Sequence, residues 1–172
     1  MKELKSLIRD IPDFPKPGIV FKDITPLLKD PEGFRDCVTM LEKAVGRHGP
    51  CDAIVGIESR GFLFGAALAM KMGVSFVPIR KPGKLPYETI SQSYELEYGS
   101  DSVEIHKDAF LPGQRIAIVD DLLATGGTMA ASCKLVESLG ATICACVFVV
   151  ELGFLAGRKK LQPYTVSSLL EF

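Results

Sequence analysis

The stretch Ile116-Ala117-Ile118-Val119-Asp120-Asp121-Leu122-Leu123-Ala124-Thr125-Gly126-Gly127-Thr128 decides the fold. It begins as an apolar run, carries two adjacent aspartates, and passes through small residues into a segment of helical period. An apolar run rich in valine and isoleucine is typical of a buried strand. Small residues predict a tight turn, because they allow backbone conformations that larger side chains exclude. The stretch therefore predicts a strand, a turn and a helix in succession, which is the repeating unit of an α/β domain.

The same unit recurs along the chain. Apolar runs that predict buried strands occupy residues 52–57, 74–79, 115–120 and 142–150. Apolar residues spaced three and four apart predict helices at residues 32–45, 60–72 and 128–139. We therefore expect an α/β fold with a central, mainly parallel twisted sheet, helices on its flanks and right-handed crossovers. In such folds ligands bind at the carboxyl ends of the strands.

Composition narrows the class of protein. The chain has 172 residues, of which 47% are hydrophobic and 24% charged, as in one ordinary globular domain. Its 20 basic and 21 acidic residues give a net charge of -1, so we expect no nucleic-acid partner and no basic membrane patch.

The cysteines and the apolar runs predict the location of the protein. Five cysteines form no CxxC pair, and two histidines lie far from them in sequence, so no zinc spacing is present. An odd number of cysteines favours a reducing compartment. The first ten residues lack the apolar core of a signal peptide, and the most hydrophobic run covers only residues 141–150. We expect a cytoplasmic protein without a membrane partner.

The turn after the central strand predicts a phosphate site. Consecutive backbone N–H groups from Ala124 to Thr128, with two threonine hydroxyls, can bind one anion at the positive end of a helix. The stretch lacks the lysine of a nucleotide triphosphatase loop, and it is not the G-x-G-x-x-G of a dinucleotide fold.

The two aspartates before this turn are expected to bind a group other than the phosphate. Asp120 and Asp121 would repel a nearby phosphate unless they held another group. Vicinal hydroxyls of a sugar suit a carboxylate, which accepts two O–H bonds, so the whole stretch predicts a ribose 5-phosphate site. The simpler alternative is an acidic turn that caps a helix, with flexible glycines after it.

Residues 81–110 form the longest segment without helical period, and long inserts of this kind often act as lids or binding loops. Within them, residues 92–98 and 102–106 can pair as a hairpin about Gly99-Ser100. A solvated hairpin with scattered charge is the alternative, and we prefer it for Tyr94 and Glu95. At the chain end, residues 164–172 fit either a last strand or a loose tail.

The central stretch resembles the motif that binds 5-phosphoribosyl 1-pyrophosphate (PRPP) in type I phosphoribosyltransferases. Other segments resemble the same family in the same order, from Phe14 to about Leu152, and look like its adenine-using members. These segments are residues 14–24, 58–62, 80–86 and 96–99. The resemblance implies a transferase that moves the 5-phosphoribosyl group of PRPP to N9 of adenine, giving AMP and pyrophosphate. It also implies Mg²⁺ held mainly by PRPP and water, a homodimer, and one domain over residues 1–172. That domain would have a hood at residues 1–30, for base recognition, and a flexible lid at 81–110.

The resemblance also implies roles for single residues. Glu58, Ser59 and Arg60 match a pyrophosphate loop, often with a cis peptide between its first two residues, although relatives often have aspartate where Glu58 stands. A surface pair between Arg60 and Glu58 is the alternative. Arg80 and Lys84 match lid positions that reach the phosphates of PRPP.

Adenine recognition and proton transfer are assigned in the same way. Phe21 matches a ring that stacks on the purine, with the backbone of Val20 and Lys22 reading its edge. Without the resemblance, Phe21 would be a core aromatic. Glu97 matches the residue that handles a proton, either by hydrogen bonding to N7 or by removing the N9 proton. Together, Glu97, Arg60 and Lys84 are the expected catalytic residues.

Two other functions fit parts of the pattern. A relative that uses guanine, hypoxanthine or xanthine would share the phosphate motifs but not the base segments. A PRPP-sensing regulator of transcription or RNA would need a DNA-binding domain or a basic face, and the near-neutral chain offers neither.

Overall fold

The computed structural model describes residues 3–95 and 99–172, and the chain forms two compact units, Met1–Met40 and Leu41–Phe172. In the first unit, the 3-10 helix η1 (Leu4–Leu7) precedes β1 (Arg9–Pro12) and β2 (Val20–Asp23), which pair antiparallel. Two helices follow, α1 (Thr25–Lys29) and the start of α2 (Pro31–Gly46). Arg9 with Asp23 and Lys22 with Asp10 form ion pairs of 2.6 Å across the two strands.

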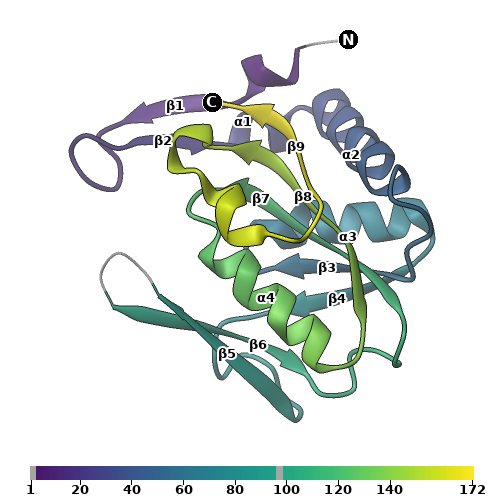
Figure 1. The fold of residues 1–172 in the computed structure, drawn as a ribbon. Coiled ribbons are helices and arrows are strands. Elements are labelled where there is room, and N and C mark those ends of the chain that lie inside the picture. The colour runs from purple at the N-terminus through teal and green to yellow at the C-terminus, as the bar shows by residue number, and fades with distance from the viewer. Residues whose placement is uncertain (1–2, 96–98) are drawn as a thin grey trace. The chain divides into compact units, whose positions relative to one another are not determined.

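The second unit contains a five-stranded sheet in the order β4-β3-β7-β8-β9, with every neighbouring pair parallel. The strands are β3 (Ala53–Ile57), β4 (Ser75–Ile79), β7 (Arg115–Leu123), β8 (Thr142–Glu151) and β9 (Val166–Glu171). Helix α3 (Gly61–Met72) packs on β3, β4 and β7, while α4 (Gly127–Ser138) packs on β7 and β8 (Figure 1). The predicted α/β fold with a parallel sheet between helices is confirmed.

Residues 81–110 contain an antiparallel hairpin, β5 (Thr89–Glu95) and β6 (Ser100–His106). The sequence predicts this hairpin, but its strands begin earlier than residues 92 and 102, and residues 96–98 of the predicted first strand lie outside the described residues. The hairpin packs against α4, which is therefore covered both by the sheet and by the hairpin (Figure 1). Between β8 and β9 lie two short 3-10 helices, η2 (Gly153–Leu155) and η3 (Gly157–Leu161). The C-terminal residues form a real strand, because β9 pairs with β8 from Val166 onward.

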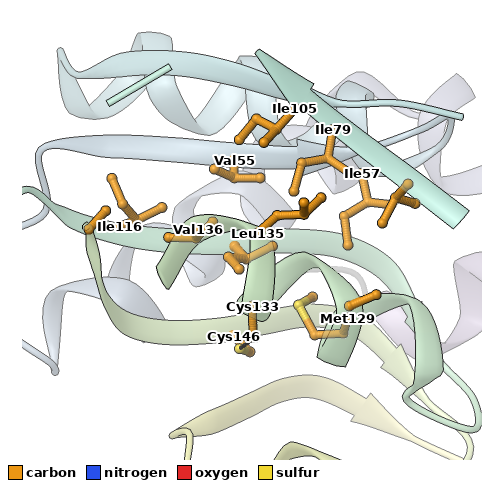
Figure 2. Close-up of a cluster of buried hydrophobic side chains, with 14 of the residues drawn as sticks. Val55, Ile57, Ile79, Ile105, Ile116, Met129, Cys133, Leu135, Val136 and Cys146 are labelled. Atoms are coloured by element: carbon orange, nitrogen blue, oxygen red, sulfur yellow. Dashed lines mark hydrogen bonds between the residues drawn. The ribbon is translucent and has the colours of Figure 1, made fainter. Parts of the chain in front are cut away.

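The core of the second unit lies between the sheet, α4 and the hairpin. Val55 and Ile57 of β3 meet Leu135 and Val136 of α4, and Ile105 of β6 closes the cluster (Figure 2). Each of these side chains is at most 2% exposed. Alternate residues of a strand face opposite sides, so Ile54 and Gly56 face α3 instead. Gly65 of α3 confirms this contact, because a Cβ on it would lie 3.2 Å from the Gly56 Cα.

The central strand is longer than the sequence indicates. We expected it to end at Asp120, but β7 continues to Leu123, which pairs with Glu151 of β8. The long apolar partner strand extends the ladder, and Leu123 is 1% exposed. Asp120 and Asp121 therefore stand on a rigid strand rather than in a loop.

The strand order locates the functional edge. The connection through α3 leads from β3 to β4 on one side, and the connection through α4 leads from β7 to β8 on the other. In open α/β sheets, ligands bind where the order reverses, at the carboxyl ends of the two strands concerned. Here those strands are β3 and β7, and they are neighbours in register, with Gly56 opposite Val119. In the part of the chain that is described, no helix has the length and apolar character to cross a bilayer.

Candidate functional site

A small cavity lies at the N-terminus of α4. Its volume is about 80 Å³, and it is lined by Asp120, residues 122–129 and Phe148. Gly126 is the N-cap of the helix and adopts a φ of 78°, a left-handed conformation that favours glycine. All five residues predicted to bind a phosphate, Ala124, Thr125, Gly126, Gly127 and Thr128, line this cavity. A helix N-terminus with free N–H groups is suited to an anion.

The two aspartates have different environments. Asp120 lines the cavity, and its Oδ1 accepts a 2.9 Å hydrogen bond from the Asp121 N–H. Burial and the charge of Asp121 raise the pKa of Asp120 well above its usual range. Asp121 is 4% exposed and pairs through Oδ2 with Arg60 Nε at 3.0 Å. Burial raises its pKa as well, although Arg60 opposes the shift. No signal in the sequence distinguishes the two acids.

Glu58, Ser59 and Arg60 connect the end of β3 to the start of α3, next to the two aspartates. The peptide between Glu58 and Ser59 is cis, as the resemblance implies. Gly61 follows at once, and a Cβ on it would lie 2.8 Å from Asp120 Oδ1. The alternative of a surface pair between Arg60 and Glu58 is replaced by the ion pair of Arg60 with Asp121.

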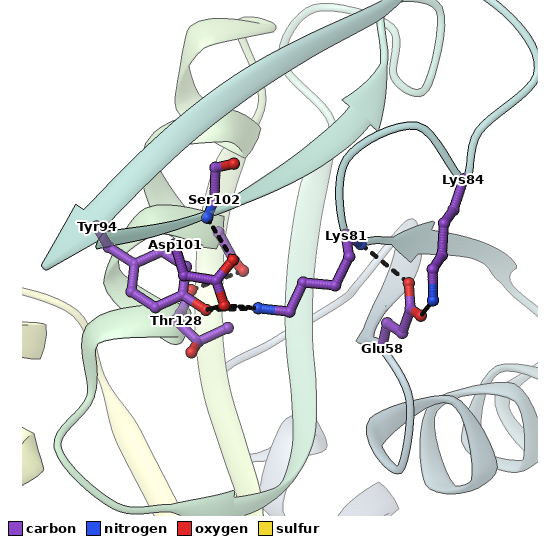
Figure 3. Close-up of polar contacts among 8 residues, drawn as sticks. Glu58, Lys81, Lys84, Tyr94, Asp101, Ser102 and Thr128 are labelled. Atoms are coloured by element: carbon purple, nitrogen blue, oxygen red, sulfur yellow. Dashed lines mark hydrogen bonds and ion pairs between the residues drawn. The ribbon is translucent and has the colours of Figure 1, made fainter. Parts of the chain in front are cut away.

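Glu58 accepts hydrogen bonds from two basic side chains and one backbone N–H, and Figure 3 shows those from Lys84 and from the Lys81 N–H. Its Oε2 accepts hydrogen bonds from Arg80 Nε at 3.1 Å and from the Lys81 N–H at 2.9 Å, while Lys84 Nζ donates to Oε1 at 2.7 Å. Burial acts against ionisation, but hydrogen bonds from Lys84, Lys81 and Arg80 lower the pKa of Glu58 to about 2. Two predicted lid residues, Arg80 and Lys84, are thus brought to the predicted pyrophosphate loop.

This cluster predicts a loss of stability in acid. Because the pKa of Glu58 falls from 4.5 to about 2 on folding, its contribution is complete above pH 4.5 and is lost as the pH drops towards 2. We expect Glu58→Gln to lower the free energy of unfolding by about 2 kcal/mol at pH 7 and by almost nothing near pH 2. Urea unfolding of both proteins at several pH values measures this, and a difference that stays constant with pH would contradict it.

Tyr94 was expected to be a solvated hairpin residue, and this expectation is wrong. Its side chain is half-buried, and a Cβ on Gly127 would lie 3.3 Å from its Cδ2. The Tyr94 hydroxyl accepts a 2.8 Å hydrogen bond from Lys81 Nζ and donates one of 3.2 Å to Asp101 Oδ2 (Figure 3). Lys81 also pairs with Asp101. Sequence reasoning missed these three residues. The alternation of β5, which turns Ile90, Gln92 and Tyr94 to one face, is the signal that could have found Tyr94.

The predicted base-binding residues lie in the first unit. Val20, Phe21 and Lys22 belong to β2, and the rings of Phe21 and Phe14 meet edge to face with centroids 5.2 Å apart. Lys22 Nζ donates to Asp10 Oδ1 at 2.6 Å. Glu97, the predicted proton handler, lies outside the described residues.

Comparison with known proteins extends this picture. The chain matches the phosphoribosyl transferase domain family over residues 23–169. It is 62% identical to the adenine phosphoribosyltransferase of Thermoanaerobacter pseudethanolicus over 100% of this chain and 99% of that protein. The crystal structure of that enzyme superposes with a TM-score of 0.96 over 99% of both chains.

A solved structure with lower sequence identity has the same fold. The Saccharomyces cerevisiae adenine phosphoribosyltransferase, complexed with D-2,5-dideoxy-2,5-imino-altritol 1,6-bisphosphate and adenine, is 46% identical with a TM-score of 0.91. The match covers 98% of this chain and 97% of the yeast chain. The chain therefore belongs to the phosphoribosyltransferase family, among the adenine phosphoribosyltransferases.

Proposed function

We propose that this protein transfers the 5-phosphoribosyl group of PRPP to N9 of adenine, giving AMP and pyrophosphate in purine salvage. One observation of the structure carries the proposal: the N-terminus of α4 and the Asp120 carboxylate share a single cavity. Free N–H groups suit a phosphate and a carboxylate suits a sugar diol, and a ribose 5-phosphate carries both groups. The choice of adenine rests on relatives that are named for it and match the full length of this chain.

In the proposed complex, the loop of residues 124–128 binds the 5-phosphate. Asp120 accepts hydrogen bonds from the ribose hydroxyls, whereas Asp121, which does not line the cavity, contributes by holding Arg60. Negative charge beside the sugar also favours the cation-like state that forms at the anomeric carbon during displacement. Burial and the charge of Asp121 raise the pKa of Asp120, and the hydroxyls of a bound diol would give its carboxylate further hydrogen-bond donors.

The pyrophosphate of PRPP is proposed to bind at Glu58, Ser59 and Arg60 together with Arg80 and Lys84. In the free protein, Arg80 and Lys84 are held by the Glu58 carboxylate. Pyrophosphate offers both cations a more highly charged partner than one carboxylate does. Glu58 thus keeps two phosphate-binding side chains near the site before the substrate arrives, and the lid insert at residues 81–110 brings Lys84 with it.

Magnesium is proposed as the metal of the reaction. Among the described residues, no group of three His, Cys, Asp or Glu side chains is placed to hold a metal ion. Mg²⁺ is commonly held by substrate phosphates, water and one or two carboxylates, and Asp120 is the carboxylate that lines the cavity. When bound, the metal would neutralise charge on the leaving pyrophosphate. Arg60 and Lys84 would hold the same group from the protein side.

We also propose a cytoplasmic homodimer with one catalytic domain over residues 1–172. All five cysteines are free, which suits a reducing compartment. Leu63 and Met70 of α3 are 46% and 83% exposed, and exposed apolar side chains of this size favour a protein partner such as a second copy. Residues 1–30 are proposed as the base-recognition segment.

A substrate assay tests the proposal. Each purine base is incubated with PRPP and Mg²⁺, and nucleotide formation is followed by chromatography. We expect AMP from adenine, and at least about 10²-fold slower reaction with hypoxanthine or guanine, because a site that matches the adenine edge leaves groups unpaired against other bases. Removal of Mg²⁺ by EDTA should stop the reaction, and added Mg²⁺ should restore it. Equal rates with hypoxanthine would refute the assignment.

Glu97 is proposed to act on the purine, with Val20, Phe21 and Lys22 holding it. We expect Glu97→Ala to lower kcat by about 10²-fold or more, which is typical of losing a general acid or base. The matched control is Glu95→Ala, which removes an exposed carboxylate two residues earlier and should leave kcat unchanged. Steady-state kinetics of both variants decide the matter, and similar rates for the two would remove the proton-transfer role.

A further inference from the structure

The 124–128 loop also contacts η3 (Gly157–Leu161), whose residues do not line the cavity. The loop packs directly against the backbone of η3. A Cβ on Gly126 would lie 2.5 Å from the Gly157 carbonyl oxygen and 3.4 Å from the Gly157 Cα. A Cβ on Gly157 would in turn overlap the Ala124 carbonyl oxygen and lie 3.0 Å from Leu123 Cδ1. No side chain fits between the two backbones, so the position of Gly157 sets the position of the loop.

Gly157 is held in place by the next residue, Arg158. Its Nε donates to Glu151 Oε1 at 2.7 Å and its Nη2 donates to Glu151 Oε2 at 2.6 Å, which makes a bidentate pair. Glu151 ends β8 and is 5% exposed. The Ser168 hydroxyl of β9 donates to Glu151 Oε2 at 2.6 Å, and Arg158 Nη1 donates to the Val166 carbonyl at 2.9 Å. Arg158 thereby ties η3 to two strands of the sheet.

In this arrangement, residues outside the cavity determine the position of the loop that is proposed to bind the phosphate. An anion site made of backbone N–H groups depends on the position of the loop, since it has no long side chain to adjust. Displacement of a binding group by about 1 Å can cost on the order of 10²-fold in rate. The 124–128 loop carries glycines, which leave it freer than other residues would. A contact that holds the loop from behind is therefore a direct means of organising it before PRPP binds.

We propose that Arg158 is a positioning residue for PRPP: through its bidentate pair with Glu151 it holds Gly157 behind Gly126 and so fixes the N–H groups that receive the 5-phosphate. The inference rests on the proposed function and adds residues 151, 157, 158 and 168 to the site. It differs from a general anchoring of the chain end, which would affect stability but not the affinity for phosphate.

The test compares variants by affinity and by stability. Arg158→Ala removes the bidentate pair, and Arg158→Lys keeps the charge but not the fork. The matched control is Tyr164→Phe, which removes a 2.9 Å hydrogen bond from the Tyr164 hydroxyl to Glu137 Oε2 and so loosens the same connection at another point. Each protein is titrated with ribose 5-phosphate by calorimetry, its melting temperature is measured, and KM is determined for PRPP and for adenine.

We expect Arg158→Ala to raise the Kd for ribose 5-phosphate and the KM for PRPP about tenfold, with the KM for adenine within twofold of the starting value. The Kd and KM of Arg158→Lys should lie between those of Arg158→Ala and those of the unmodified protein. Tyr164→Phe should lower the melting temperature and leave the Kd unchanged. If Arg158→Ala melts earlier but binds ribose 5-phosphate as tightly as the unmodified protein, Arg158 is an anchor only and the inference is overturned.

Two further outcomes are covered. If Arg158→Ala does not fold, Ser168→Ala takes its place, since it removes one hydrogen bond to Glu151 and should raise the Kd two- to threefold; an unchanged Kd then overturns the inference. The unmodified protein separates this inference from the proposed function. If it binds ribose 5-phosphate but forms no AMP from adenine and PRPP, the function fails while the effect of Arg158 on the loop is still measured.

Discussion

Replacing Asp120 with alanine is expected to lower kcat/KM for PRPP by about 10²- to 10³-fold while the protein stays folded. Of the described residues that line the cavity, Asp120 alone carries a charge, so nothing else there replaces its hydrogen bonds to the ribose hydroxyls. Burial and the charge of Asp121 both disfavour the ionised carboxylate and raise the pKa of Asp120. Its removal should therefore leave the melting temperature unchanged or higher.

Two other aspartates make this result specific. Asp108→Ala removes an exposed carboxylate in a turn and should alter neither property. Asp121→Ala should lower both, because it removes the buried partner of Arg60. The measurements are steady-state kinetics with varied PRPP and thermal unfolding followed by circular dichroism. If Asp120→Ala turned over at the full rate, the proposal that Asp120 binds the ribose diol would be wrong.

The second large effect is expected at Gly61, where α3 meets the central strand. Its Cα packs so closely that a Cβ would lie 2.8 Å from Asp120 Oδ1 and 2.9 Å from the Val119 carbonyl oxygen. The oxygen of Val119 belongs to the sheet backbone and cannot move aside cheaply. Gly61→Ala should cost about 1–3 kcal/mol of stability, as overpacking does, and should lower kcat/KM for PRPP at least about tenfold by displacing Asp120.

Gly46→Ala is the matched control for this substitution. Gly46 is the last residue of α2, and a Cβ on it would meet no atom within 4 Å. Alanine is the better helix former by up to about 1 kcal/mol, so this variant should be as stable as the unmodified protein or more stable. Urea unfolding and the adenine assay compare the two variants. A Gly61→Ala protein that matches Gly46→Ala in both would show that the helix can shift without disturbing the site.

The sequence alone predicts the parts of this protein that are local in the chain. The alternation of apolar runs and helical segments indicates a parallel sheet between helices, and residues 115–139 indicate a strand, a turn and a helix. These predictions succeed because the interactions that determine them lie within a few residues: strand propensity, helix periodicity, and the small residues of the turn. Even the hairpin of β5 and β6 could be placed, since its two strands are close in sequence.

The tertiary structure decides which residues act together. Asp121 pairs with Arg60 while the adjacent Asp120 lines the cavity, so two neighbouring acids acquire different surroundings. Glu58 pairs with Arg80 and Lys84. Tyr94 packs on Gly127, and Gly157 packs on Gly126. All of these contacts join segments far apart in the chain. No local pattern encodes them, because they depend on strand order and on how closely backbones approach, which only the folded chain sets.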